Sequence, residues 1–535
     1  MCKQLGCSYF SALQLSSNTN YLSARIINEM IETIGAELFA ELVTEVSNSP
    51  AWGVMVDETT DISVSKQLGL VVRYIGPDGD VKSKVLSLKT VSSGDSATLT
   101  EAILEATAVL PMDRFTSFAS DGASAMIGRR AGVGQRLKDQ YPGLLTIHCV
   151  AHRLNLAVSD CIKEKKGVPY LIKYEQTINS TFWFYQGSSN RAASLKEMER
   201  VFELPQLKLQ GGNQTRWESS RDATNVLLRI MPAVLADLSK QARSEPTAEG
   251  LYRFFRHEFF PPTLCLMHVV HNKLHRQFQV FQMRNLFFSR VEQEVTALIS
   301  SLRNPRTQAL VKDKWESWLS DESSLQPLLD EVPAYFKDGF WDRFSATVMI
   351  PFLDMLVQNV ESRFPEMGIL GNFNVLAPRR IQEGIMDTKF GQQEMQSLAR
   401  HFPRLKEEDL LIEWEAFQEQ AMLPDLKSKT LEEVLKWLIS PNTMQLFPHL
   451  SLAAAIALTA PVQTADVERL FSALKLVKTP LRNRLRDCHL DVCCRVAIDG
   501  PQPGTFRMDN FVRRFYRSNS IRRVKCSKGG CELCK

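Results

Sequence analysis

Apolar residues recur at helical spacing near the start of the chain. Between residues 18 and 49 they fall three and four positions apart, which predicts an amphipathic helix. These positions are Ile26, Ile27, Met30, Ile31, Ile34, Leu38 and Leu42. We therefore expect residues 1–50 to form a helical lead-in to the first domain.

The pattern then changes to short runs rich in β-branched residues. "GVMVDE" begins at Gly53, "LGLVVRYIG" covers residues 68–76 and "VKSKVLSLKTVS" covers residues 81–92. The "GPDGD" between the last two runs carries the proline and glycines of a turn. The second and third runs therefore predict a β-hairpin.

Helices and two further strands are expected next. A helix should run from Ser96, a residue type favoured at the N-cap, to Val109, and "RFTSFASDG" (114–122) predicts a strand. "ASAMIGRRAGVGQRLKDQY" predicts a helix interrupted at its glycines, and "GLLTIHCVAHRLNLAVSDCI" predicts a strand that leads into a helix. This order of elements predicts a mixed α/β sheet within residues 51–165.

The remainder of the chain has the pattern of helices. Long amphipathic stretches fill residues 166–445, without a fixed repeat, and predict an all-helical domain. Residues 446–500 predict a compact helical end. Residues 501–535 form a basic, cysteine-containing tail.

Composition narrows the class of protein. With 44% hydrophobic and 23% charged residues in 535, the chain is typical of a multidomain globular protein, and its net charge of +4 says little. Eleven scattered cysteines favour a reducing compartment over a disulfide scaffold. The most apolar window, residues 450–462, is too short to span a bilayer and contains Pro461, so no membrane association is expected. We also see no signal peptide.

Acidic residues follow two of the predicted strands. Asp57 and Asp121 each stand where an apolar run of the same sheet ends, and strand ends are where such sheets bind ligands. Two nearby carboxylates repel each other unless a cation joins them. Hard oxygen ligands suit Mg²⁺ or Mn²⁺, and a pair of such ions can hold the attacking and leaving oxygens of a phosphodiester. The alternative is that both acids merely cap loops.

Glu468 is the candidate for a third acid. It lies in "TADVERLFSALKLV", where Thr464 can cap a helix and Glu468 borders the apolar stripe. The alternative is a solvated glutamate that pairs with Ser472 or Lys475 on its own helix.

Five ordered motifs carry a resemblance to a known family. "MVDETTD", "SDGASAMIG", "HCVAHRLNL", "TRWESS" and "ERLFSALKLVKTPLRNRL" resemble the hAT superfamily of DDE transposases, over about residues 20–500. They are most similar to its domesticated vertebrate, zinc-finger-protein-862-like members. The resemblance implies an RNase H-like α/β core interrupted by a large all-α insertion domain, with a C-terminal helical hAT dimerisation region.

The same resemblance assigns roles to residues. It makes Asp57, Asp121 and Glu468 the DDE triad, which holds Mg²⁺ or Mn²⁺ in active members. Cys149 and His152 match the C-x-x-H element of the family, for which the isolated pair of residue types favours a structural role.

Two further residues match a nucleic-acid element of the family. Arg216 and Trp217 correspond to its R-W element, whose tryptophan stacks on a flipped base in active relatives. By residue type alone, a tryptophan such as Trp217 is most often a core aromatic, and base stacking depends on the R-W context.

The ends of the chain raise separate expectations. Active relatives usually carry a BED-type zinc finger before the core, and Cys2 and Cys7 without histidines do not form one. In the tail, Cys526, Cys531 and Cys534 offer three thiolates for Zn²⁺, with a fourth ligand expected from Cys488, His489, Cys493 or Cys494. The alternative is a flexible tail with incidental cysteines.

Arginines of the tail suggest contact with nucleic acid. Arg513, Arg514, Arg522 and Arg523 favour a DNA contact through phosphates or a nuclear-import signal, and a solvated basic face is the alternative.

Two hypotheses follow for function. The first is a nuclear, transposase-derived protein that binds DNA and self-associates without cutting, with no small-molecule substrate. The second is an active Mg²⁺-dependent transposase or nuclease; an RNase H-like exonuclease is disfavoured because it needs no helical insert. Homodimerisation is suggested by the apolar helices of residues 446–498, unless they pack on the protein's own core. Their apolar residues are Leu450, Leu452, Ile456, Leu470, Leu474 and Leu485.

Overall fold

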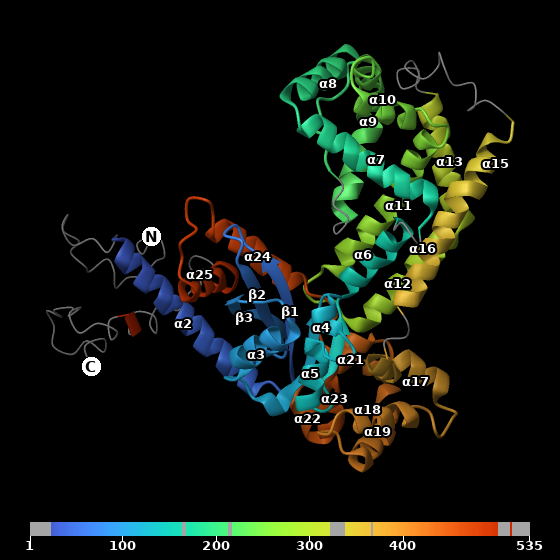
Figure 1. Cartoon of the computed structure of the whole chain (residues 1–535). Coiled ribbons are helices and arrows are strands. Elements are labelled where there is room, and N and C mark those ends of the chain that lie inside the picture. The colour runs from blue at the N-terminus through green and yellow to red at the C-terminus, as the bar shows by residue number, and fades with distance from the viewer. Residues whose placement is uncertain are drawn as a thin grey trace. The chain divides into compact units, whose positions relative to one another are not determined.

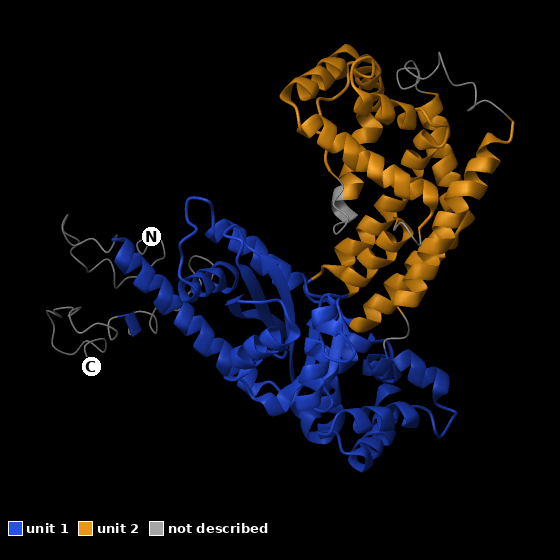
Figure 2. Ribbon diagram, viewed as in Figure 1, with its two compact units in different colours: residues 1–149, 284–287, 368–535 blue, residues 150–283, 288–367 orange. Residues whose placement is uncertain are grey.

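The computed structural model describes residues 23–162, 167–211, 217–320, 338–364, 368–500 and 514–515, without the side chains of residues 217–219. The chain forms two compact units, coloured separately in Figure 2. Unit 1 comprises the described residues of 1–149, 284–287 and 368–535, and unit 2 those of 150–283 and 288–367.

A five-stranded sheet is the centre of unit 1. Its strands are β1 (Trp52–Thr60), β2 (Lys66–Ile75), β3 (Val81–Val91), β4 (Phe115–Ser120) and β5 (Leu145–His148). Their spatial order is β3-β2-β1-β4-β5. Strands β1, β2 and β3 pair antiparallel, whereas β4 and β5 run parallel to β1. The predicted mixed sheet and its β2–β3 hairpin are confirmed.

Apolar residues from both faces of the sheet form the core of unit 1. Trp52 at the start of β1 stacks on Phe115 of β4, with ring centroids 4.5 Å apart. Its indole Nε1 donates a hydrogen bond of 2.9 Å to the Pro111 carbonyl, which satisfies the one polar group of a fully buried side chain. The first strand is thereby fixed against the fourth.

The helices of unit 1 are α2 (Ala24–Asn48), α3 (Ser96–Thr107), α4 (Ser124–Ile127), α5 (Val133–Gln140), α17 (Pro378–Gly384), α18 (Gln392–His401), α19 (Glu407–Ala421), α20 (Pro424–Lys427), α21 (Leu431–Leu438), α22 (Pro441–Leu446), α23 (Pro448–Thr459), α24 (Ala465–Val477) and α25 (Asp487–Asp499). Some of these helices lie against the sheet, and others, such as α17, α18 and α19, form a group to one side of it (Figure 1). Short 3₁₀ segments occupy Met112–Arg114 (η1) and Gly368–Leu376 (η5).

The caps of two helices differ from the sequence prediction. The N-cap of α3 is Asp95 rather than Ser96, because the Asp95 carboxylate accepts hydrogen bonds from the Ala97 and Thr98 amides. Thr464 does precede α24, but its side chain makes no capping hydrogen bond. The side chain of Gln463 accepts from the Ala465 amide instead. Both cases follow from a neighbour with a better-placed acceptor.

Helix α25 covers the free edge of the sheet at strand β3. A β-bulge at Leu86 shifts the β2–β3 register and leaves backbone groups of β3 unpaired. Asp491 and Asp499 accept from the Leu88 and Val85 amides, each at 2.7 Å. Arg495 donates to the Val85 and Leu86 carbonyls at 3.4 and 2.7 Å. One face of α25 is therefore fixed to the sheet of its own chain.

Replacing Arg495 with methionine should lower the free energy of unfolding by about 1–2 kcal/mol, because two buried carbonyls lose their donor. Methionine retains much of the aliphatic bulk, so packing changes little. Urea unfolding measures the loss. The control is Arg379→Met, which removes a surface arginine that is 90% exposed and should change stability by less than about 0.5 kcal/mol. Equal effects of the two substitutions would contradict the role of Arg495 at the sheet edge.

The described part of unit 2 is helical. Its helices are α6 (Val150–Ser159), α7 (Pro169–Gln186), α8 (Ser189–Val201), α9 (Trp217–Gln241), α10 (Pro246–Phe255), α11 (Phe260–Phe281), α12 (Phe288–Arg303), α13 (Pro305–Leu319), α15 (Phe340–Phe344) and α16 (Ile350–Arg363), with short turns η2 (Asp160–Ile162) and η4 (Ser345–Met349). Residues 368–445 are helical too, but they pack with unit 1.

Candidate functional site

Asp57 lies inside strand β1 rather than after it. The sequence analysis placed the end of the strand at this residue, but β1 continues to Thr60 because its pairing with β2 extends from Trp52↔Tyr74 to Thr60↔Lys66. On its other side β1 pairs with β4 only as far as Met55↔Ala119. Asp57 therefore stands just beyond the point where the parallel pair separates.

Asp121 lies near Asp57, at the carboxyl-terminal end of the neighbouring parallel strand β4. Since β1 and β4 are parallel and Met55 is paired with Ala119, Asp57 lies two residues beyond this pair within β1, and Asp121 lies two residues beyond it, just after the end of β4 at Ser120. Side chains two residues apart on a strand share a face, so Asp57 lies on the same side of β1 as Met55. Asp121 also accepts a hydrogen bond of 3.2 Å from the Ala123 amide at the turn into α4.

Glu468 is brought to this edge by helix α24, which packs against β1 and β2. The close approach of α24 to the sheet depends on Gly69 of β2, which is paired with Asp57 of β1. A Cβ atom at Gly69 would lie 2.7 Å from Val467 Cγ1 and 2.9 Å from Phe471 Cε1. The absence of a side chain at Gly69 thus lets the first turns of α24 lie against the strand that carries Asp57.

Buried charges hold the beginning of α24 in place. Asp466 is 8% exposed and forms an ion pair with Arg469 one turn later, and another of 3.8 Å with Arg284. Arg73 of β2 donates to the carbonyls of Arg284 and Leu458 at 3.2 and 3.1 Å. These contacts fix the helix that carries Glu468 relative to β2.

The ionisation of Asp57 is opposed by both of the other acids. Its pKa is raised to about 7, chiefly by burial and further by the carboxylates of Asp121 and Glu468, while a hydrogen bond from the Glu58 amide acts in the opposite direction. Asp121 and Glu468 lie on separate segments of the sequence, so only the fold brings their charges to Asp57. Among the residues that the structure describes, no cationic side chain forms an ion pair with Asp57.

The two neighbouring acids have cations of their own. Lys66 pairs with Glu58 at 3.1 Å, and Lys478 pairs with Asp61 at 2.6 Å, where both side chains are buried. Burial alone would raise the pKa of Asp61. Hydrogen bonds from Lys478 and from two backbone amides instead hold it below its usual value. Asp57 is thus the acid of this segment whose charge is left uncompensated.

The chemistry of the three carboxyls suits a hard divalent cation, which would relieve their mutual repulsion. Within the described ranges, however, no group of three or more His, Cys, Asp or Glu side chains is arranged as a ready set of metal ligands. The acids interact electrostatically but do not form a closed cage. Binding of Mg²⁺ or Mn²⁺ would require their side chains to approach one another.

Cys149 and His152 fall on either side of the unit boundary. Cys149 is buried at the end of unit 1, where its amide donates a hydrogen bond of 2.9 Å to the Ser120 carbonyl beside Asp121. His152 belongs to α6 of unit 2 and is partly buried. The backbone of Cys149 therefore helps to fix the end of β4, while the structural role expected for the two side chains stays a prediction.

Several residues for which DNA or Zn²⁺ binding was predicted lie outside the described residues. These are Arg216, Arg513, Arg522, Arg523, Cys526, Cys531 and Cys534. Trp217 begins helix α9, but its side chain is not described. Arg514 is described, and it forms an ion pair of 3.0 Å with Glu37 of α2.

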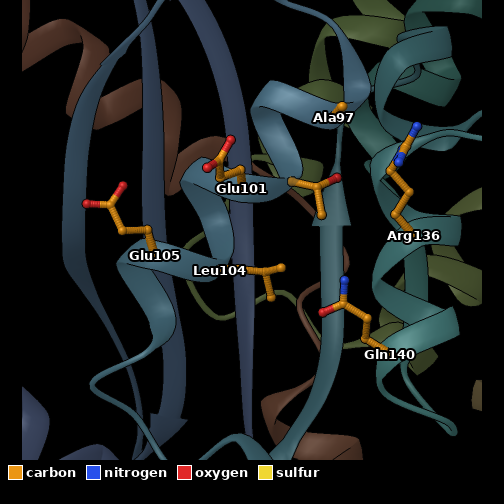
Figure 3. Close-up of a pocket in the computed structure, with 7 residues that line it drawn as sticks. Ala97, Glu101, Leu104, Glu105, Arg136 and Gln140 are labelled. Atoms are coloured by element: carbon orange, nitrogen blue, oxygen red, sulfur yellow. The ribbon is translucent and has the colours of Figure 1, made fainter.

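A separate surface hollow of about 460 Å³ lies between α3 and α5 (Figure 3). Its lining residues are Ala97, Thr100, Glu101, Leu104, Glu105, Arg136 and Gln140. Two of its charged groups have partners: Glu105 pairs with Lys89 at 2.7 Å, and Arg136 donates to Ser96 and to the Ala131 carbonyl. None of the three converging acids lines it.

Sequence reasoning missed the residues that assemble the site. Gly69, Arg73 and Lys478 do not carry the candidate chemistry themselves, but they hold α24 and the β1–β2 turn in place. A signal was available only for Gly69, since a glycine inside an apolar strand suggests close approach of another element.

Two segments of the chain match known families. Residues 9–132 match the family described as ZMYM1/FAM200, RNase-like domain, and this match includes Asp57 and Asp121. Residues 413–497 match the hAT family C-terminal dimerisation region, which includes Glu468.

In the described ranges no helix has the length and apolar character needed to cross a membrane.

Proposed function

We propose that this hAT-related, transposase-derived chain is a nuclear protein that binds DNA, holds a divalent cation at Asp57, Asp121 and Glu468, and self-associates. The two family matches support the transposase ancestry and a homodimer. The finer relationship to zinc-finger-protein-862-like proteins belongs to the proposal and rests on the motif resemblance. So does the view of unit 2 as an insertion into an RNase H-like core.

The observation that carries the proposal is the raised pKa of Asp57. Carboxyl groups from β1, β4 and α24 lie near enough for two of them to oppose ionisation of the third. An acid such as Asp57, which forms no ion pair with the described residues and lies near two further carboxyls, is costly unless a cation completes the site. Such a cation also binds phosphate oxygens, which is why DNA is the proposed partner.

The residues of the chain have distinct parts in this proposal. Asp57 and Asp121 hold the cation from adjacent parallel strands, and Glu468 closes the site from α24. When bound, the cation supplies Lewis-acid activation of a phosphodiester oxygen. Gly69 and Arg73 act as positioning residues, because they determine where α24 lies. Tail arginines add phosphate contacts, and a salt-dependent affinity for DNA that weakens on deletion of residues 507–535 would support them.

Cation binding is tested by thermal unfolding with and without Mn²⁺ at pH 8. A ligand at about 100 times its dissociation constant stabilises the native state by about 2.7 kcal/mol, so we expect the melting temperature of the wild type to rise by a few degrees. Asp57→Asn should abolish the shift. The control is Asp113→Asn, which removes an acid that is 75% exposed on η1 and should keep the full shift.

Retained activity is the second candidate function, favoured by a carboxyl with a pKa near neutrality. An assay for nicking of supercoiled DNA in the presence of Mn²⁺ distinguishes an active nuclease from a protein that binds the cation without cutting. Cleavage by the wild type that is lost in Asp57→Asn but kept in Asp113→Asn assigns the activity. Equal nicking by wild type and Asp57→Asn excludes it. A Mn²⁺ shift without nicking leaves a cation-binding, non-cutting protein.

A further inference from the structure

The apolar helices of the dimerisation region are already used within their own chain. Of the six residues from which self-association was expected, four are buried: Leu450, Ile456, Leu470 and Leu474 are at most 2% exposed. Leu452 and Leu485 are partly buried. Helix α24 lies on Gly69, and α25 is hydrogen-bonded to β3. Since these faces are covered, a partner copy must use the surface that remains.

Exposed apolar side chains gather at the end of α24. Leu476 is 83% exposed and Leu481, four residues beyond the helix end, is fully exposed. The β1–β2 turn adds Ile62 and Val64, which are 53% and 83% exposed. We call Ile62, Val64, Leu476 and Leu481 the turn patch. Ile62 lines one hollow together with Pro480, the residue before Leu481, and exposed apolar side chains grouped in this way are a feature of protein interaction sites.

A hollow joins the two segments of the turn patch. It measures about 310 Å³ and is lined by Ile62 from the turn, Phe471 and Leu474 from α24, and Pro480. Leu481 immediately follows Pro480, so a protruding leucine stands beside a recess that these apolar side chains line in part. The rest of the lining is polar: Thr59, Thr60, Asp61, Lys475, Lys478 and Thr479. A surface that carries both a projection and a recess can match a second copy of itself about a two-fold axis.

The turn is held in a conformation that costs free energy. Val64 has a φ of 60°, in the left-handed region, which is rare for a β-branched residue. The conformation is enforced by the buried Asp61–Lys478 ion pair and by hydrogen bonds from the Ser63 and Ser65 amides to Asp61. Strain of this kind, held by surrounding contacts, marks sites where the presented side chain matters.

We infer that the turn patch is the surface through which two copies of this chain associate. The inference rests on the proposed self-association and locates it. Continuity with the matched dimerisation region supports it, because α24 and residues 478–481 belong to that region. Nucleic acid is a less favourable partner for the turn patch than a second copy of the chain. Arg482 and Arg484 at its border could contact phosphates, but the four apolar side chains of the patch would remain exposed to water.

The test measures the dimer dissociation constant of the full chain by sedimentation equilibrium, with retained fold checked by circular dichroism. Leu481→Asp should raise the dissociation constant at least about tenfold, as expected for an apolar residue at the centre of an interface. Val64→Gly should also raise it, while its melting temperature stays at or above that of the wild type, because glycine adopts this φ without strain. The matched control is Leu446→Asp, at a leucine of the same matched region that is 70% exposed on α22. It should change the constant by less than about twofold.

Each other result overturns the inference in a distinguishable way. If the wild type is a dimer and Leu481→Asp and Val64→Gly leave it unchanged, the turn patch is wrong while self-association stands. If Leu446→Asp separates the copies instead, the interface lies on α22. If Leu481→Asp weakens duplex DNA binding but not the dimer, the occupant is nucleic acid. A wild type that stays monomeric defeats both the inference and the proposed self-association.

Discussion

Replacing Gly69 with valine should lower the free energy of unfolding by about 1–2 kcal/mol, although valine is the better strand former. The gain in β-propensity is at most about 1 kcal/mol. Against it stands overpacking, which costs about 1–3 kcal/mol for added methyl groups in a close-packed core. The Cβ alone would lie 2.7 Å from Val467 and 3.2 Å from Leu470, and valine adds two methyl groups beyond it. The steric term therefore exceeds the propensity term.

The consequence for the site follows from the position of Gly69 opposite Asp57. The helix must move away from the sheet to accommodate the valine, and Glu468 moves with it. We expect the Mn²⁺-dependent rise in melting temperature to shrink in Gly69→Val. Chemical unfolding gives the stability. Gly371→Ala is the control, since a Cβ there meets no atom within 4 Å; it should change neither quantity. Full retention of the Mn²⁺ shift in Gly69→Val would show that α24 is not needed for cation binding.

The sheet could be predicted from the sequence because its signals are local. Alternation and turn residues within 53–92 define the hairpin, and the run before Asp121 defines β4. The extent of β1 could not be predicted, since it depends on two different partners: β2 continues to pair beyond Asp57 whereas β4 does not. Long-range pairing of this kind leaves no local pattern.

The roles of the acids were separable only in part. Sequence motifs pointed to Asp57, Asp121 and Glu468, and the fold brings them together. The same stretch holds Asp61, whose partner Lys478 is distant in sequence, so the motif alone could not show that one acid is structural. Likewise, Leu450, Leu470 and Leu474 pack in the core of their own chain, and this is visible only from their burial.

Asp57 should make the protein less stable as the pH rises from about 4 to about 7. Its pKa is 3.8 in the unfolded chain and about 7 in the folded one, so across this window the native state holds a proton that the unfolded state has lost. A rise in pH stabilises the state that binds fewer protons, which here is the unfolded state. The penalty is absent below about pH 4 and complete above about pH 7.

Asp57→Asn removes this penalty because asparagine does not titrate. The full shift would correspond to about 4 kcal/mol at about 1.4 kcal/mol per pH unit, but Asp57 is only partly buried, so we expect a gain on the order of 2 kcal/mol at pH 8. The difference in the free energy of unfolding between variant and wild type should vanish at pH 4. Urea unfolding at pH 4 and at pH 8, in the presence of EDTA, measures this difference. Mn²⁺ at pH 8 should then reverse the order, because the cation stabilises only the wild type. If Asp57→Asn is destabilising at pH 8 without metal, the carboxylate is compensated by the protein itself, and the argument for a cation at this sheet edge fails.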